Sequence, residues 1–595
     1  NGKKHEAPPS AEALLPAKIA AAPSTMPDPS LPGPFKVRTM TYGSGTDLHR
    51  PEYAAGVAIK TKPVDGSAFI DQWEGRSGWD RTRYWGFDSK KLPVQGRVWY
   101  PEGAGPFPLV LIVHGNHSME DFSDSGYGYL GELMASRGFI FASLDENFLN
   151  SSAGNLLGVP DIGLKEENDA RGWMMLEHIR VWKEWNAEAS NPFHGKVDME
   201  NIALIGHSRG GEAVAVAALF NQLPYYPDNA RIHLGYRYGI RGVAAIAPVD
   251  GQYKPAGLET PVQNVSYFVL QGSADGDVQS FHGSRVYHRV KFTGQDYRFK
   301  ATLYINDANH GQFNTNWGAH DRGFGLAPRL MNYAQIMPAE DQRRIAKVYL
   351  SAYLEILLHG KKGYLPLFAD HRAAPGWLPS GIYMQQFQDS TAQMVSTYEE
   401  DLDVTTTTMP GGSESAERLC EWKEALVKIK WGDMNTRAAF LGWNTKEAGI
   451  GSYTIRLPET GLKLDAGSTL IFSLADAKKD PDVCDPNKKK DADKDKSEKK
   501  DEKKDDKPIQ LSVEVSDGVV TASLPVAVQR QIETHVMKAD GLGNTARFET
   551  LFQTYQLPLA AFAQVDPAKV KTVRFVFDKT EKGVVVLDDV GFRGQ

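Results

Sequence analysis

Residues 202–211 read Ile-Ala-Leu-Ile-Gly-His-Ser-Arg-Gly-Gly, and the alanine-rich stretch Glu212–Leu219 follows them. An apolar strand here runs into a G-x-S-x-G turn, and the turn runs into a helix. The motif alone is weak evidence, but the strand before it and the helix after it make it specific. A serine on such a sharp turn has a strained backbone and a hydroxyl that stands clear of the sheet. Ser208 is therefore predicted to be a nucleophile.

The sequence around this turn, from Phe35 to about Gly360, alternates short aliphatic runs with longer amphipathic ones. The strand candidates are Val94–Tyr100, Leu109–Val113, Phe139–Leu144, Ile202–Gly206, Val243–Ala247, Val265–Leu270 and Thr302–Ile305. Helices are expected at Glu166–Trp185, Gly211–Phe220 and Pro338–His359. This alternation is typical of an α/β domain, a doubly wound and mostly parallel sheet covered by helices. We place that domain at residues 35–371.

A nucleophilic serine needs a general base, which we expect late in the domain, after its last strand. His310 fits this position, because it lies in the turn Asp-Ala-Asn-His-Gly, residues 307–311, after the strand-like run Ala301–Ile305. The glycine that follows lets the loop bring the imidazole towards the serine. His310 is the predicted base.

Three aspartates are candidates for the acid that orients this base. Asp275 and Asp277 lie in the run Gly-Ser-Ala-Asp-Gly-Asp-Val, residues 272–278, which follows a buried strand. Asp250 lies in Ala-Pro-Val-Asp-Gly, residues 247–251, at the end of the preceding strand. We prefer Asp275, which would accept a hydrogen bond from His310 and stabilise the imidazolium. Asp277 and Asp250 remain alternatives.

The predicted oxyanion hole takes its N–H donors from two places. One is the backbone of Arg209, at the start of the helix after Ser208. The other is the loop His-Gly-Asn-His, residues 114–117, which follows the strand Leu109–Val113. There the backbone N–H of Asn116 or His117 is the candidate.

The order of His-Gly, G-x-S-x-G, acid and histidine resembles the α/β-hydrolase superfamily over about residues 35–360. Residues 206–211, Gly-His-Ser-Arg-Gly-Gly, and 248–251, Pro-Val-Asp-Gly, are similar to the chlorophyllase-like esterase branch, in which the acid can lie on the earlier turn. Residues 272–278 instead resemble the acid turn of the prolyl oligopeptidase branch. The resemblance favours the later turn, because in the superfamily's strand order its loop neighbours the loop of the histidine.

After about Gly381 the pattern changes to period-two strands separated by turn residues, which predicts an all-β sandwich over residues 381–595. Its strand candidates are Tyr383–Phe387, Tyr453–Leu457, Thr469–Leu474, Leu511–Val515, Val519–Leu524, Val573–Phe577 and Val584–Leu587. Lys478–Lys507 is so rich in lysine and acids that we expect a solvated, disordered insertion. The segments 552–559, 573–577 and 586–592 resemble the closing strands of the galactose-binding-like jelly rolls found beside carbohydrate-active enzymes.

Composition narrows the possible partners. The net charge is -7 and no basic face is legible, so nucleic acid is not an expected partner. No apolar run is long enough to span a bilayer.

Residues 1–34 are rich in proline and alanine and are predicted to form a flexible tether, typical of an exported or lipid-anchored bacterial protein. Cys420 and Cys484 allow one disulfide.

These observations predict a serine carboxylesterase that works through an acyl-enzyme on bulky, polymeric or carbohydrate-linked esters, without cofactor or metal. The resemblance to exported bacterial esterases, some of which act on polyesters, suggests the secreted, periplasmic or surface-anchored location. One alternative is a serine peptidase of prolyl oligopeptidase type, although residues 35–101 are too few for that family's propeller. A non-catalytic binding protein on a hydrolase fold is the other alternative.

Overall fold

The computed structural model describes residues 23–70, 73, 75–151, 164, 167–321, 336–460, 462–484, 508–530, 532, 536–537 and 547–594. The chain divides into two compact units, Pro23–Tyr383 and Met384–Gln595. Most of the expected charged insertion, residues 485–507, lies outside the described residues, as do residues 1–22. Among the described residues, no helix combines the length and apolar character needed to cross a membrane.

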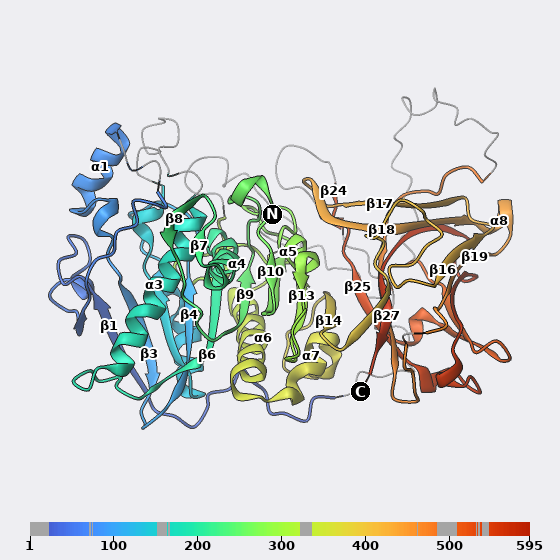
Figure 1. The fold of residues 1–595 in the computed structure, drawn as a ribbon, viewed down its shortest axis with the longest axis horizontal. Helices are drawn as coiled ribbons and strands as arrows, with labels where there is room; N and C mark the ends of the chain where they lie inside the picture. The colour runs from blue at the N-terminus through green and yellow to red at the C-terminus, as the bar shows by residue number, and fades with distance from the viewer. Residues whose placement is uncertain are drawn as a thin grey trace. The chain divides into compact units, whose positions relative to one another are not determined.

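The first unit is built on a mixed sheet in which nine strands follow the order β13-β11-β9-β6-β4-β5-β3-β1-β2 (Figure 1). Five consecutive pairings, from β13 to β5, are parallel, whereas β3 runs antiparallel to both β5 and β1. The bounds are β1 Val37–Gly43, β2 Ile59–Lys60, β3 Gly96–Pro101, β4 Phe107–Val113, β5 Ile140–Leu144, β6 Val197–His207, β9 Ile240–Ile246, β11 Ser266–Gly272 and β13 Phe299–Ile305. The chain passes from the first unit to the second in strand β14 (Tyr383–Asp389).

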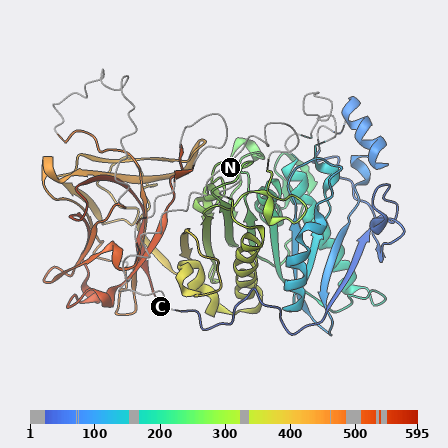
Figure 2. The same ribbon diagram turned by 180° about the vertical axis from the view of Figure 1, so that it is seen from behind.

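The central strands are apolar throughout, because both faces of the sheet are covered. Every residue of β4, β11 and β13 is buried. Helices α3 (Asn168–Ala187) and α4 (Arg209–Gln222) pack together on one face, and α2 (Gly128–Ser136) and α6 (Ala339–His359) pack together on the other (Figures 1 and 2). The expected strands and helices of this unit are thus confirmed. Helix α1 (Gly75–Trp85), helix α2 and the two strands β1 and β2 had no clear signal in the sequence.

The expectation of a free tether is wrong for residues 23–34. Residues 23–34 have no regular secondary structure, but they are bound to the first unit and lie at its lower edge as dark blue chain in Figure 1. The backbone N–H of Ser24 donates to Ala373 at 2.7 Å, and Arg344 forms an ion pair with Asp28 at 3.0 Å. Composition alone suggested a free tether because a proline-rich segment gives no sign of the surface on which it docks.

The second unit contains two large antiparallel sheets that enclose a shared hydrophobic core, and a small sheet that pairs β23 (Val536–Met537) with β24 (Arg547–Phe548). One sheet has the order β17-β18-β27-β20-β25, with β15 also paired to β27, and the other has the order β16-β19-β26-β21-β22. Trp443, Phe472 and Phe575 pack in the shared core, which draws side chains from both sheets. The bounds are β15 Ala392–Ser396, β16 Ser413–Glu417, β17 Glu421–Lys428, β18 Asp433–Asn444, β19 Gly451–Arg456, β20 Thr469–Asp476, β21 Ser512–Ser516, β22 Thr521–Pro525, β25 Gln553–Pro558, β26 Thr572–Phe577 and β27 Lys582–Arg593. Each strand expected here overlaps one of these strands or β14.

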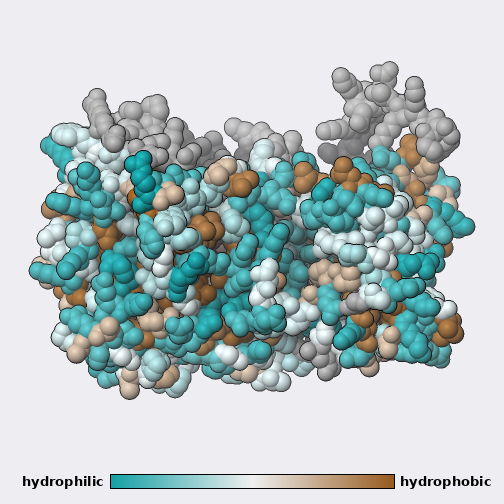
Figure 3. All heavy atoms as spheres, viewed as in Figure 1, coloured by the Kyte–Doolittle hydropathy of each residue, from teal (hydrophilic) through white to brown (hydrophobic). Residues whose placement is uncertain are grey.

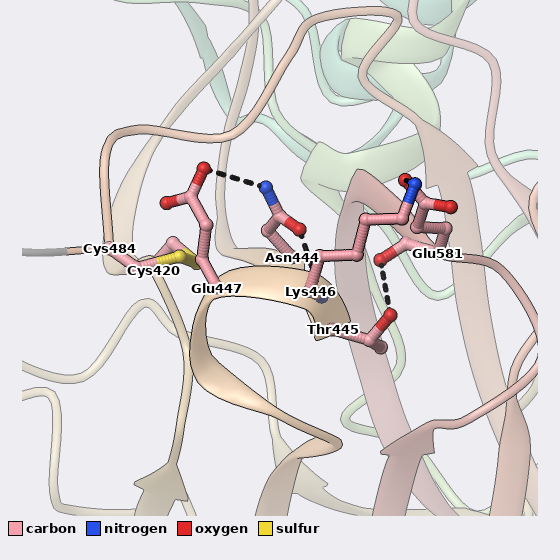
Figure 4. Close-up of a disulfide and its surroundings, with 7 residues drawn as sticks. All are labelled: Cys420, Asn444, Thr445, Lys446, Glu447, Cys484 and Glu581. Carbon is pink, nitrogen blue, oxygen red and sulfur yellow. Dashed lines mark hydrogen bonds and ion pairs between the residues drawn. A yellow bond between two sulfur atoms is a disulfide. The ribbon is translucent and has the colours of Figure 1, made fainter.

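A disulfide joins Cys420, just before β17, to Cys484, the last residue described within the expected insertion Lys478–Lys507 (Figure 4). The expectation of disorder is therefore wrong for residues 478–484, which this bridge holds to the second unit. It lies beside the short helix α8 (Thr445–Ala448), whose Lys446 forms an ion pair with Glu581 at 2.8 Å. The two cysteines are 64 residues apart, so the bridge restricts the unfolded chain and stabilises the unit by about 4 kcal/mol.

Exposed apolar side chains are scattered over the surface. Trp79 and Leu258 of the first unit and Val519 of the second are examples. On the face drawn in Figure 3, most residues are teal or white and the brown ones are dispersed. Isolated exposed hydrophobic residues are normal on soluble proteins and identify no partner surface.

Candidate active site

Ser208 lies at the sharp turn between β6 and α4. Its backbone angles are φ 58° and ψ -121°, an unusual conformation for a residue other than glycine. A Cβ on Gly206 would meet the carbonyl oxygen of Gly210 at 1.8 Å, so only glycine lets the chain fold back on itself here. The G-x-S-x-G pattern therefore has a steric cause.

The loop after β4 lies directly against this serine. Because β4 and β6 pair in parallel with Val113 opposite Gly206, the residues that follow the two strands leave the sheet side by side. A Cβ on Gly115 would lie 2.4 Å from the Cβ of Ser208 and 2.9 Å from its Oγ. Strand β5 lies on the other side of β4, so this is also a point where the connections diverge, the usual place for a ligand in an open α/β sheet.

The predicted oxyanion donors lie at this junction. Arg209 is the first residue of α4, and an N–H at that position has no partner within its helix. The side chains of Asn116 and His117 are bound elsewhere: Asn116 holds Ser151, and His117 contacts Ser118 and Ser123. Among the described residues, no hydrogen bond uses the backbone N–H of Asn116 or His117.

His310 and Asp275 come together at the carboxyl ends of β13 and β11. The parallel pairing of these strands puts Gly272 opposite Ile305, so the two following loops are neighbours. The Nδ1 atom of His310 lies 2.9 Å from the Oδ2 atom of Asp275, and both side chains are buried. Asp275 also accepts hydrogen bonds from the backbone N–H groups of Asp277 and Val278, at 2.9 and 2.7 Å, which fix its orientation.

The two alternative acids have different surroundings. Asp250 forms a bidentate ion pair with Arg289, with one N–O distance of 3.0 Å, and does not contact His310. Asp277 is half exposed and lies 3.6 Å from Nε2, the other ring nitrogen of His310. Of the three candidates, Asp275 therefore contacts the nitrogen that an orienting acid should hold.

The base lies next to the serine turn without a hydrogen bond to it. The rings of His207 and His310 are 4.8 Å apart, and Trp317 stacks parallel to His310 at 6.1 Å. Among the described residues, no hydrogen bond joins Ser208 Oγ to His310. In enzymes without substrate, this contact is often long and shortens only in the complex.

His310 differs from the neighbouring histidines His117 and His207 in the direction of its pKa shift. Burial alone would lower the pKa of His310, but the negative charges of Asp275, Asp277 and Asp321 outweigh burial and raise that pKa above its ordinary value of 6.5. Burial raises the pKa of Asp275, and the charge of His310 partly opposes this. Burial lowers the pKa of His117 to about 4 and that of His207 well below its ordinary value, so both are neutral at pH 7.

Asp321 is a further site residue that sequence reasoning missed. Its Oδ2 accepts hydrogen bonds from the backbone N–H groups of His310 and Gly276, at 3.0 and 2.9 Å. Its Oδ1 accepts from Gly311 at 2.8 Å and from the side chain of Asn309 at 2.7 Å. The Asp321 carboxylate therefore links the loop that carries His310 to the turn that carries Asp275. No local motif marks this position.

Glu212 was also missed, although an acid in the first turn of a helix is a recognisable signal. It is buried on α4, and its Oε1 accepts the backbone N–H groups of residues 251, 252 and 253 at 2.7, 2.9 and 3.1 Å. Burial raises the pKa of Glu212 to about 7. The carboxylate holds the loop after β9 against α4, the helix that follows Ser208.

One similar protein is a chlorophyllase. Chlorophyllase-1, chloroplastic, from Citrus sinensis is 24% identical to this chain over 168 residues, which is 28% of the chain and 40% of the chlorophyllase. The match thus spans less than half of that protein's length. No protein-family model matches the chain. The similarity is distant and partial, and it supports an ester hydrolase at most.

Proposed function

We propose that this chain is a serine carboxylesterase with an α/β-hydrolase fold, in which Ser208, His310 and Asp275 form the catalytic triad. The 2.9 Å contact between His310 Nδ1 and Asp275, beside a serine with φ 58° on a strand-to-helix turn, carries the proposal. The mostly parallel sheet and the distant similarity to a chlorophyllase support it.

In the proposed mechanism, Ser208 Oγ attacks the ester carbonyl carbon while His310 Nε2 takes the hydroxyl proton. The backbone N–H groups of Arg209 and of Asn116 or His117 donate hydrogen bonds to the oxyanion of the tetrahedral intermediate. When the C–O bond breaks, His310 returns its proton to the leaving alkoxide, and an acyl-enzyme remains. Water then attacks the acyl carbon with His310 as the base, which releases the acid and restores Ser208.

The proposed substrates are bulky esters, polymeric or carbohydrate-linked. The connection between β9 and β11, residues 247–265, contains only the 3-10 turn Pro255–Gly257 and the two-residue strand β10 (Val262–Gln263). It therefore holds no large helical lid of the kind that encloses small substrates. We further propose that the second unit is a galactose-binding-like jelly roll that holds the enzyme at an insoluble substrate.

We also propose that the protein is exported. The disulfide between Cys420 and Cys484 supports this, because disulfides persist mainly in oxidising compartments. We propose a bacterial source and a lipid anchor as well, from the proline- and alanine-rich composition of residues 1–34 and from the resemblance to exported bacterial esterases.

A screen of the full chain against aryl esters of increasing acyl length, beside peptide anilides, tests the proposed function. We expect hydrolysis of the esters and little or none of the anilides. A preference for anilides would instead favour the peptidase that the acid turn at residues 272–278 resembles. If the chain binds these compounds and hydrolyses none, it is a binding protein on a hydrolase fold.

A further inference from the structure

The two halves of the proposed oxyanion hole come from different loops, so something must fix their relative position. One half is the N–H of Arg209 at the start of α4, and the other is the loop 114–117 after β4. A displacement of 1 Å between catalytic groups can slow an enzyme substantially. A chain of polar side chains, which we call the oxyanion network, connects the two halves through Glu167, Arg171 and Asn150.

The first part of the network leads from the helix start to α3. Arg209 Nη1 donates to Glu167 Oε1 at 2.6 Å, and Arg171 Nε donates to the same oxygen at 3.4 Å. Glu167 is the residue just before α3, and Arg171 lies in its first turn. The position of α3 against α4 is itself fixed by close packing, since a Cβ on Gly172 would meet the carbonyl oxygen of Ala213 at 2.9 Å.

The second part leads from α3 to the loop after β4. Arg171 Nη2 donates to Asn150 Oδ1 at 2.6 Å, and Asn150 Nδ2 lies 3.1 Å from His117 Nε2. His117 Nδ1 lies 2.8 Å from the carbonyl oxygen of Ser118, so this nitrogen carries the hydrogen and Nε2 is the acceptor, which faces Asn150 Nδ2 and also the hydroxyl of Ser123 at 2.8 Å. Burial lowers the pKa of His117 to about 4, which keeps it neutral and able to accept this hydrogen bond.

The network is shielded from water. The side chains of Arg171 and Glu167 are 0% and 1% exposed, and that of Arg209 is 23% exposed. A buried guanidinium is costly unless it is paired, and removing one partner of a buried ion pair is destabilising because the other charge is left unpaired. Only the planar guanidinium has several donors in a fixed fork, so it can hold Glu167 and Asn150 at once, and lysine cannot reproduce this geometry.

We propose that Arg171 is a positioning residue that holds the two halves of the oxyanion hole in register. Its effect reaches the reaction through Arg209 on one side and through Asn150 and His117 on the other. The inference rests on the proposed function, because the oxyanion hole has meaning only if Ser208 is the nucleophile.

The test uses the full chain and the variants Arg171→Met, Arg171→Lys and Arg209→Met. The matched control is Arg137→Met, since Arg137 is a mostly buried arginine, 9% exposed, whose ion pair with Glu355 lies outside the network. For each protein, kcat and KM are measured on an aryl ester, and the Ki is measured for phenylboronic acid, which forms a tetrahedral adduct with a reactive serine. Thermal unfolding reports stability.

If Arg171 positions the oxyanion hole, Arg171→Met lowers kcat by roughly 10–100-fold and raises the boronate Ki by a similar factor, while KM changes little. Arg171→Lys should lie between that variant and wild type, and Arg209→Met should show the same pattern more weakly. Arg137→Met should change only the melting temperature.

A folded Arg171→Met enzyme with wild-type kcat and Ki overturns the inference, as does an equal loss of kcat in Arg137→Met. If Arg171→Met does not fold, Arg209→Met decides the question, because its side chain is partly exposed and the backbone N–H is kept. Wild-type kcat and Ki in Arg209→Met would reject the inference that the oxyanion network positions the oxyanion hole. A wild-type chain that neither hydrolyses esters nor binds the boronate instead rejects the proposed function.

Discussion

Asp275 and Asp250 each follow a buried strand and each is buried, yet they have different partners. Asp275 contacts His310, whereas Asp250 is held by Arg289. The local sequence does not separate them, because both lie in ordinary Asp-Gly turns, and only the strand order of the superfamily that the chain resembles favours Asp275. The difference depends on which side chains the sheet brings nearby, and that is a property of the folded chain.

The first residue-level prediction ranks the acids. Asp275→Asn should lower kcat by roughly 10³–10⁴-fold, the scale known for the corresponding change in serine proteases, because the amide cannot stabilise the imidazolium. Asp250→Asn should lower the melting temperature by weakening the pair with Arg289, with kcat per folded enzyme near wild type. Kinetics and thermal unfolding of both variants check this. A severe kcat defect in Asp250→Asn with a mild one in Asp275→Asn would support the chlorophyllase-like arrangement.

The second residue-level prediction concerns pH. His310 acts as a base only when neutral, and the neighbouring carboxylates raise its pKa above 6.5, so kcat/KM should rise with pH through an apparent pKa above that value. Asp277→Asn removes a charge 3.6 Å from Nε2, which should lower the pKa of His310 and move the rising limb to lower pH. Because Asp277 is half exposed, we expect about half a pH unit. If the rise of kcat/KM with pH is unchanged in Asp277→Asn, or moves to higher pH, His310 is not the group that titrates.

At the level of elements, the site is assembled by neighbouring strands whose ends are in register. Strands β4 and β6 bring the loop 114–117 to Ser208, and β11 and β13 bring Asp275 to His310. The sequence predicts these strands because fully buried strands form continuous apolar runs. It does not predict β1, the antiparallel direction of β3, or the side chains that fasten the loops, such as Asp321 and Glu212, since these depend on contacts distant in sequence.

Asp321 provides the element-level prediction, because its carboxylate accepts four hydrogen bonds from the acid turn and the histidine loop. Asp321→Asn replaces one oxygen with an amide group that cannot accept, so the two loops should lose their fixed spacing. We expect kcat to fall by roughly tenfold with a small change in KM. Steady-state kinetics at several pH values measure this effect.

Asp307→Asn is the control for this prediction. Asp307 lies in the same histidine loop, and its carboxylate makes no hydrogen bond to a described residue. Its backbone has φ 62°, a conformation that asparagine tolerates as well as aspartate. Equal losses of kcat in the two variants would mean that Asp321 has no special positioning effect.

At the level of the whole molecule, the two units are predicted to contribute different functions. If the second unit holds the enzyme at an insoluble substrate, a chain that ends at Tyr383 should keep its kcat/KM on a soluble short-chain ester. It should lose most of its rate on an emulsified polyester or an acylated polysaccharide. Parallel assays of the full and shortened chains, with thermal unfolding as the folding control, measure this. Equal activity of both chains on both substrates would reject the targeting role.

The most direct measurement of the central claim is covalent labelling of the nucleophile. A serine activated by a neighbouring base reacts with an organophosphonate, whereas ordinary serines do not. The native chain is treated with a fluorophosphonate and digested, and mass spectrometry locates the adduct; Ser208→Ala is treated in parallel and assayed on an aryl ester. We expect one adduct, on Ser208, and loss of both labelling and esterase activity in the variant. An adduct on another residue, or full activity in Ser208→Ala, would contradict the proposed mechanism.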